Sequence, residues 1–335
     1  MPNKEKMEFA SKQVVVNCLK IEPNEKVTII TDNSIKHIAE VIVKELEKVT
    51  KNYKIFNMDD YGERRMENPL KFPNEIKEYM SSGTASMYIA EAGPGEFVSF
   101  RSPMLEVIKG SKLRHAHMIS ITDEIMETGM CADYSKVQEI CKKVYKVVQS
   151  AKRAKVTADR GTDVVLGFNP DWRWHVCNGV ITRGHWQNLP DGEVYTCPND
   201  VNGRLVVDGV LGDSFISYGI MSESPLVLQI KNGRVVEVNC ENKKLEDEYK
   251  KYIKTDENAN RIGEFGIGTN TGLTKFVGNL LQDEKFPGAH FAVGDGYPDE
   301  TGCDWESKVH CDGVIQNPTI EIDGRKIMEK GKFLI

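Results

Sequence analysis

The stretch KVTIITDNSIKHIAEVIVKEL, residues 26–46, sets the pattern of the first half of the chain. Its first six residues are a short apolar run rich in β-branched side chains, which is typical of a buried strand. Asp32 and Ser34 follow with side-chain oxygens of the kind that cap a helix. Apolar residues then recur every three or four positions through Leu46, so we expect a helix over about 34–49 that packs one face on the sheet.

Similar signals alternate through the rest of this half. We expect helices at residues 5–19, 74–81, 103–110 and 134–154, and strands at 53–57, 85–90 and 116–121. Alternating helices and apolar strands favour a parallel sheet that is covered by helices on both faces. The sequence therefore predicts the α/β fold class, with an N-terminal doubly wound α/β domain over residues 1–155. No glycine-rich phosphate loop follows the first strand, so we assign no nucleotide to this domain.

Near residue 155 the pattern changes to short strands that are separated by glycine turns. The expected strands lie at 155–159, 163–168, 193–197, 204–210, 225–231, 234–239, 288–293, 307–314, 319–322 and 325–328. Asn232 and Gly233 form a strong hairpin signal between two of them. Helices are expected at 243–254 and 271–281. The sequence thus predicts a C-terminal α+β domain over residues 156–335, and we place the metal-binding and catalytic residues in it.

Composition excludes several classes of protein. The 335 residues are 40% hydrophobic and 28% charged with a net charge of −6, so no global positive field attracts nucleic acid or anionic lipid. No apolar run is long enough to span a membrane, and residues 1–8 lack the apolar core of a secretory signal. We therefore expect a cytoplasmic protein without nucleic-acid or membrane partners, in which the eight cysteines stay reduced.

Ionisable side chains gather in glycine-flanked segments of the second half. His310 and Asp312 are two positions apart on an expected strand, so they project from the same face. His290 lies inside another apolar strand, and Glu193 and Glu264 each directly follow a glycine. Such groups are costly to bury unless they are paired or bind a metal, and this set suits Zn, Co, Mn or Fe(II). Taken singly, each residue is more often structural, and spacing alone leaves a metal site and a structural role both open.

Several other polar residues are expected to be structural. His115 and His117, around the fourth strand of the first domain, are expected to be packing or interdomain residues, and a place lining the cleft stays open. Asp283, Glu284 and Lys285 form a charged triplet, and we expect a solvated turn there.

Four segments resemble the metal-binding motifs of the thermophilic metallo-aminopeptidase family, the aminopeptidase T type, which is leucyl aminopeptidase-like. The segment NLPDGEVYTCP, residues 188–198, is similar to the family's NLPGGEVFTAP, with Asp191 in place of a glycine and Cys197 in place of an alanine. The further matches, in the family's order, are Gly263-Glu264, His290 with Tyr297 seven residues later, and His310 with Asp312. The segments 18–27 and 161–163 also match, so the resemblance covers most of the chain.

The resemblance implies a set of site residues and an activity. Two divalent ions would be held by Glu193, Glu264, His290, His310 and Asp312. Tyr297 would be a catalytic side chain near the scissile bond, and Glu193 is the candidate to take a proton from the attacking water. The family further implies a homodimeric hydrolase, a metalloprotease that removes N-terminal residues from small peptides.

Two other functions stay open at this point. The same fold family includes ring-cleaving dihydroxypyridine dioxygenases, which hold a single Fe(II). In that case His310, Asp312 and one of His290 or Glu264 would bind the iron. A non-catalytic metal-dependent binding protein is the third alternative, and the presence of Tyr297 argues against it.

Overall fold

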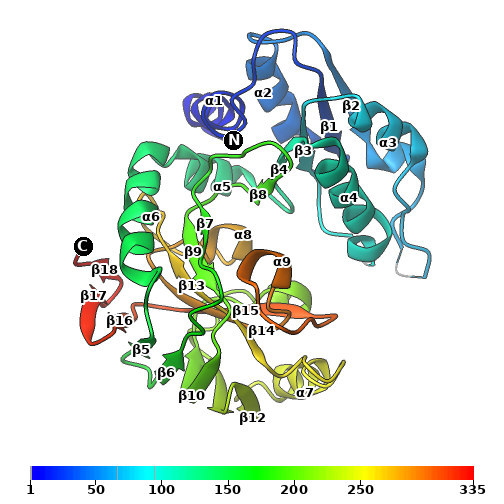
Figure 1. Ribbon diagram of the computed structural model, residues 1–335. Helices are drawn as coiled ribbons and strands as arrows, with labels where there is room; N and C mark the ends of the chain where they lie inside the picture. The colour runs from blue at the N-terminus through cyan, green and yellow to red at the C-terminus, as the bar shows by residue number, and fades with distance from the viewer. Residues whose placement is uncertain (1, 66, 94) are drawn as a thin grey trace. The chain divides into compact units, whose positions relative to one another are not determined.

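The computed structural model describes residues 2–65, 67–93 and 95–335. They form two compact units (Figure 1). The first unit contains the chain up to Tyr134 and the segment Gly179–Asp191, and the second contains Ser135–Asn178 and Gly192–Ile335. This grouping assigns the segment Gly179–Asp191 to the first unit, whereas the change of pattern in the sequence predicts a single domain boundary at residue 155. The division into domains at residue 155 stays a prediction.

The first unit is built on a five-stranded parallel sheet in the order β2-β1-β3-β4-β8. Its strands are β1 (Val27–Thr31), β2 (Tyr53–Asn57), β3 (Ala85–Ile89), β4 (Arg114–His117) and β8 (Trp186–Asn188). Sequence patterns predict the first four near these places. They do not predict β8, which is too short to show an alternating pattern.

Helices connect these strands and cover both faces of the sheet. They are α1 (Lys4–Lys12), α2 (Lys36–Leu46), α3 (Asn74–Ser81), α4 (Ser102–Ser111) and α5 (Asp123–Glu127). Because β2 and β3 flank β1 on opposite sides, right-handed crossovers place α2 on one face and α3 and α4 on the other. Figure 1 shows this arrangement. The predicted doubly wound α/β fold is confirmed. The helix expected at 5–19 is α-helical over Lys4–Lys12 and continues as a π-helix over Gln13–Cys18.

The second unit contains α6 (Tyr134–Val148) from its second residue onward, and an eight-stranded antiparallel sheet in the order β12-β11-β10-β6-β5-β16-β17-β18. Its strands are β5 (Arg153–Thr157), β6 (Asp163–Gly167), β10 (Asp200–Val207), β11 (Leu226–Lys231), β12 (Arg234–Asn239), β16 (Thr319–Ile322), β17 (Arg325–Glu329) and β18 (Lys332–Phe333). The predicted hairpin is present, because Asn232 and Gly233 both have positive φ and join β11 to β12.

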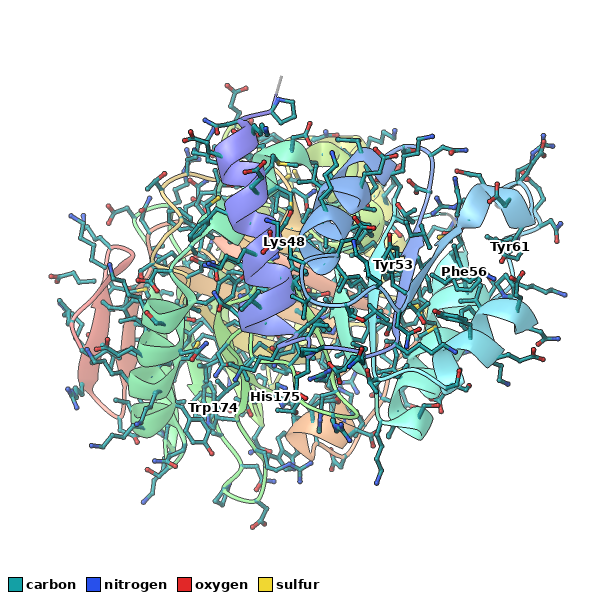
Figure 2. The ribbon with its side chains drawn as sticks, turned by 90° about the horizontal axis from the view of Figure 1, so that it is seen from above. Lys48, Tyr53, Phe56, Tyr61, Trp174 and His175 are labelled. Carbon is teal, nitrogen blue, oxygen red and sulfur yellow. The ribbon has the colours of Figure 1, made fainter. Side chains whose placement is uncertain are left out.

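A second antiparallel sheet of this unit has the order β15-β14-β13-β9-β7. Its strands are β7 (His175–Cys177), β9 (Glu193–Thr196), β13 (Ile262–Gly268), β14 (Gly288–Gly294) and β15 (His310–Ile315). The helices α7 (Lys243–Tyr252), α8 (Leu280–Asp283) and α9 (Pro298–Thr301) complete the unit. Trp174 and His175, labelled in Figure 2, lie at the start of β7. We call this five-stranded layer the site sheet.

The helix expected at 271–281 is wrong. Most of this segment is irregular, and only α8 is helical. Gly278 has a φ of +77°, and the Asp283 carboxylate accepts hydrogen bonds from the N–H groups of Val277, Gly278 and Asn279. These bonds offer the backbone an alternative to helical pairing. Within the described ranges, we find no helix with the length and apolar character needed to cross a membrane.

Candidate metal centre

The site sheet has one apolar face and one face that carries ionisable groups. Because side chains alternate along a strand, Phe265 of β13 and Phe291 of β14 pair on one face, with ring centroids 5.2 Å apart. Glu264 and His290 occupy the neighbouring positions and point to the other face. The apolar face belongs to the core, which fixes the strand register and so fixes where the ionisable groups meet.

The structure brings all five predicted ligand residues together on this face. Two groups of three share one carboxylate: Glu193, Glu264 and His290 form the first, and Glu264, His310 and Asp312 form the second. In each group one possible ligand atom per residue lies within 4.8 Å of the others. The residues come from four neighbouring strands, β9, β13, β14 and β15. Their role as ligands stays a prediction.

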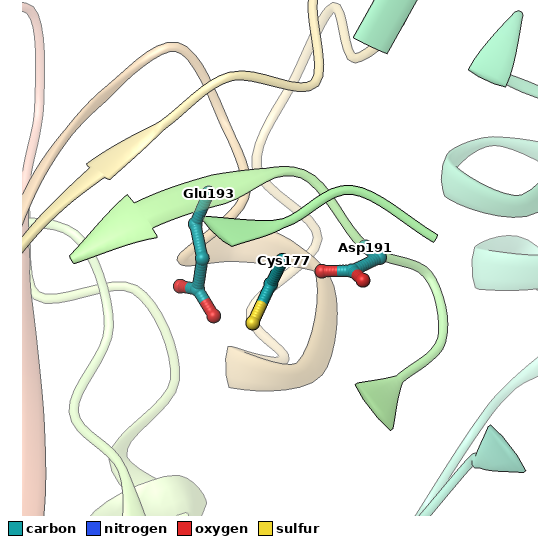
Figure 3. Close-up of side chains that lie close together, drawn as sticks. All are labelled: Cys177, Asp191 and Glu193. Atoms are coloured by element: carbon teal, nitrogen blue, oxygen red, sulfur yellow. The ribbon is translucent and has the colours of Figure 1, made fainter. Parts of the chain in front are cut away.

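Small residues leave room between these side chains. Gly266 lies opposite His290 in the register of β13 and β14, and a Cβ atom at Gly266 would lie 1.9 Å from His290 Nε2. Ala292 lies between Glu264 on one side and Asp312 on the other. Glu193 opens β9 opposite Cys177 of β7, as Figure 3 shows. Glycine and alanine thus keep the centre of the face free for the converging ligands.

The distances between the polar atoms fit ligands that share an ion. Glu264 Oε1 lies 3.0 Å from His290 Nε2, and Glu264 Oε2 lies 3.6 Å from His310 Nε2. Glu193 Oε2 is 3.3 Å from His290 Nε2, and Asp312 Oδ2 is 3.3 Å from His310 Nε2. Ligand atoms about 2.1 Å from a tetrahedral Zn²⁺ lie about 3.4 Å from one another. The two oxygens of Glu264 therefore face two separate groups, as a bridging carboxylate would.

The histidine ring nitrogens support the same interpretation. His310 Nδ1 lies 3.1 Å from the carbonyl oxygen of Asp295, so an N–H there donates to it and the lone pair of Nε2 faces Glu264 and Asp312. His290 Nδ1 is buried without a hydrogen-bond partner among the described residues, and its Nε2 faces two carboxylates. One N–H cannot donate well to both carboxylates at once, whereas a cation attracts both. The donor set therefore fits a divalent metal ion.

Charges at the site shift the pKa values of its residues in a consistent way. Burial lowers the pKa of His290 and of His310, but the neighbouring carboxylates outweigh it and raise these pKa values to about 9 and about 10. Burial raises the pKa of Asp312, but His310 outweighs it and lowers the pKa to about 2. Burial is the main cause of the raised pKa of Glu264. The buried carboxylates make the site strongly negative. Protons on the histidines or a bound metal ion can balance this charge.

The predicted catalytic tyrosine lies next to the second group. Tyr297 directly precedes α9 with a φ of +53°, an uncommon backbone conformation for a bulky residue. Its ring centroid is 4.5 Å from that of His310 and 6.3 Å from that of Tyr195. Burial, with the negative charges of Glu264 and Asp312, holds the pKa of Tyr297 well above its usual value. The hydroxyl stays protonated at neutral pH and can donate a hydrogen bond.

The solvated turn expected at residues 283–285 is wrong, and two residues of this segment, which the sequence pattern does not indicate, lie at the site. Glu284 and Lys285 are buried, and Lys285 Nζ lies 2.6 Å from Glu193 Oε1 and 2.7 Å from Glu284 Oε1. Apolar residues flank the triplet on both sides, from Leu280 to Pro287. This apolar frame is the signal that could have indicated burial.

Comparisons with known proteins agree with the resemblance in the sequence. The pattern of the family described as thermophilic metalloprotease (M29) matches residues 109–333. Aminopeptidase T of Thermus aquaticus is 30% identical over 203 residues, which cover 52% of this chain and 47% of that protein. The chain thus spans about half the length of this relative.

Two solved structures share the fold over nearly the whole chain. Wild-type AmpT from Thermus thermophilus matches with a TM-score of 0.72 at 17% identity, covering 99% of this chain and 100% of that chain. A 2,5-dihydroxypyridine dioxygenase from Pseudomonas putida KT2440 matches with a TM-score of 0.73 at 13% identity, covering 99% and 98%. At such low identity these two likenesses establish the fold and leave the reaction open. Because the family pattern covers most of the sequence, this chain belongs to the thermophilic metalloprotease family (M29).

Proposed function

We propose that this protein is a metal-dependent aminopeptidase that removes N-terminal residues from small peptides. The observation that carries the proposal is Glu264, whose two oxygens face His290 and His310 separately. One carboxylate between two ligand groups suits two divalent ions such as Zn, Co or Mn. When bound, such ions lower the pKa of a water ligand to about 7 and polarise a carbonyl.

The residues around the ligand groups support peptide hydrolysis. The ring of Tyr297 lies against that of His310, and its hydroxyl is the proposed donor to an oxyanion that develops on the substrate carbonyl. Such a donor stabilises the transition state by about 3 kcal/mol. Glu193 is the proposed acceptor of the proton that leaves the attacking water. A site with two ions and flanking carboxylates would hold the free α-amine and the adjacent carbonyl of a peptide together, which favours cleavage at its N-terminus.

A second candidate is a mononuclear Fe(II) ring-cleaving dioxygenase. The observation that favours it is the fold shared with the dihydroxypyridine dioxygenase. The iron would then be held by His310, Asp312 and one of His290 or Glu264. This reaction gives no role to Glu193, which nevertheless lies 3.3 Å from His290 Nε2. We therefore rank it second, and a metal-dependent binding protein without catalysis third.

One preparation of the protein tests both reactions. Metal content is measured after purification without added metal, and peptides with free and acetylated N-termini are then offered under air and under nitrogen. We expect about two Zn, Co or Mn ions per chain and cleavage of the free peptides only, independent of oxygen. One iron per chain with oxygen uptake on a dihydroxylated aromatic ring, and intact peptides under every metal, would support the dioxygenase instead.

The assembly and location of the protein are part of the same proposal. The family resemblance implies a homodimer, which sedimentation of the purified chain tests directly. A cytoplasmic location stays a prediction from the sequence.

A further inference from the structure

Lys285 is the one lysine with a buried side chain in the part of the chain that the structure describes. Its side chain is 1% exposed, and its Nζ contacts one oxygen of Glu193 and one oxygen of Glu284. An ammonium group is costly to bury unless charges of opposite sign replace its water. The two carboxylates supply those charges, and one of them belongs to the metal centre.

The backbone fixes this lysine against the end of the site sheet. Gly268, the last residue of β13, lies opposite Glu193 in the sheet register. A Cβ atom at Gly268 would lie 2.0 Å from the carbonyl oxygen of Phe286, so the segment that carries Lys285 passes directly against β13. The Lys285 carbonyl accepts a hydrogen bond from the N–H of Asn270 at 2.9 Å. The distance from Lys285 to Glu193 is therefore set by paired backbone rather than by a flexible loop.

The contact with Lys285 separates the two oxygens of Glu193. Oε1 lies 2.6 Å from Lys285 Nζ, whereas Oε2 lies 3.3 Å from His290 Nε2. A glutamate side chain on its own samples several rotamers, and either oxygen could then face the ion. The ammonium group restricts this freedom, because rotating the Glu193 carboxylate away would break one of the two ion pairs that the buried Lys285 makes.

We propose that Lys285, anchored by Glu284, is a positioning residue of the metal centre that turns Glu193 Oε2 toward the ion position beside His290. The inference rests on the proposed function, since Glu193 binds metal only in that reading. Groups that orient metal ligands through hydrogen bonds change metal affinity by about 10- to 100-fold when they are lost.

The first variant is Lys285→Met, which keeps an unbranched side chain of similar size and removes its charge. We expect the metal-free variant to bind Co²⁺ about 10- to 100-fold more weakly in competition with a chelator. The visible absorption of the bound Co²⁺ should also change, because Glu193 no longer presents one fixed oxygen. The control is Lys308→Met, which removes an exposed lysine two residues before His310 and should leave affinity and spectrum unchanged.

A second variant separates positioning from simple charge balance. In Lys285→Met the Glu284 carboxylate loses its ammonium partner, which can destabilise the fold without any effect on Glu193. The double variant Lys285→Met/Glu284→Gln removes that charge as well, and it carries the test if the single variant does not fold. We expect the double variant to regain melting temperature while Co²⁺ affinity stays low and the spectrum stays altered.

The outcomes distinguish this inference from the proposed function. Wild-type affinity and spectrum in Lys285→Met, or their recovery in the double variant, would show that Lys285 only balances charge and would overturn the inference. A wild-type protein that binds no divalent metal would instead overturn the proposed function. Weak Co²⁺ binding with an altered spectrum in both variants supports Lys285 as a positioning residue.

Discussion

Two pairs of histidines in this protein are placed in buried strands and behave in opposite ways. In the first unit, His115 and His117 lie two positions apart on β4 and are 0% and 4% exposed. Burial lowers the pKa of His115 to about 3 and that of His117 well below its usual value. In the second unit, carboxylates outweigh burial and raise the pKa values of His290 and His310.

The neighbours of each pair explain the difference. His115 bonds to the Ser86 hydroxyl at 2.8 Å and to His117 at 3.2 Å, and His117 stacks on Tyr88 with ring centroids 4.9 Å apart. These partners carry no negative charge, burial disfavours the imidazolium form, and the positive charge of Arg101 lowers the pKa of His117 further, so the imidazoles stay neutral and pack as part of the core. The second pair faces carboxylates and attracts a cation. Burial alone therefore does not mark a functional histidine, whereas the charge of its partners does.

The largest expected effect comes from removing His310, a histidine of the second pair, or the neighbouring carboxylate Asp312. His310→Ala and Asp312→Ala should each lose bound metal and reduce kcat/KM by more than about 100-fold while the fold is kept. Elemental analysis, peptide turnover and circular dichroism measure these three properties. The matched variant in the first unit, His117→Phe, should keep metal and turnover. If both folded variants kept their full metal content, His310 and Asp312 would not be metal ligands.

The next effect concerns the tyrosine beside His310. Tyr297→Phe removes one hydroxyl and should keep its metal, because the ring contacts His310 without belonging to the ligand groups. We expect kcat to fall by more than about tenfold with little rise in KM, since the hydroxyl acts in the transition state. Steady-state kinetics with metal content measured on the same sample tests this. A wild-type kcat would assign Tyr297 a structural role.

A single methyl group tests whether the space around the second pair is needed. Gly266→Ala places a Cβ atom 1.9 Å from His290 Nε2, so the imidazole has to move. We expect metal affinity to fall by about 10- to 100-fold. Gly110→Ala in α4 is the control, because a Cβ atom there meets nothing within 4 Å and alanine favours the helix. Equal metal affinity in the two variants would contradict the crowding argument.

The smallest expected effect is a pH dependence of stability from the first pair. An unfolded histidine binds a proton near pH 6.5, whereas folded His115 binds one only near pH 3. The unfolded chain therefore binds more protons than the folded chain between these pH values. Protonation of the histidine does not reduce the stability of the fold above about pH 6.5, and it reduces that stability progressively as the pH falls below this value. Each buried histidine should cost about 2 kcal/mol of stability at about pH 5.

The variant His117→Phe isolates this contribution from the rest of the protein. Metal-free wild type and variant are unfolded by denaturant at about neutral pH and at about pH 5, so that the acidic site of the second unit contributes equally to both. We expect the free energy of unfolding of the variant, relative to that of the wild type, to be about 2 kcal/mol more favourable to folding at about pH 5 than at neutral pH. A difference that does not change with pH would mean that His117 is not neutral in the folded state.

Much of the fold could be predicted from local patterns. The alternation around residues 26–46 indicates β1 and α2, and Asn232 with Gly233 indicates the β11–β12 hairpin. The pattern fails where distant contacts decide the local structure. Residues 271–281 look helical by periodicity, but Asp283 binds backbone N–H groups and draws the chain into turns. The three-residue strand β8 forms only because β4 offers an edge to pair with.

Local sequence features indicate candidates for the metal centre, because His310 and Asp312 lie two positions apart and glycines precede Glu193 and Glu264, and the family resemblance implies the full ligand set. That Glu264 faces both histidines and that Lys285 is buried against Glu193 became visible only in the folded chain. These contacts join segments that are far apart in the sequence. Periodicity along a strand fixes the face on which a side chain lies, whereas register between strands distant in sequence fixes which charges meet there.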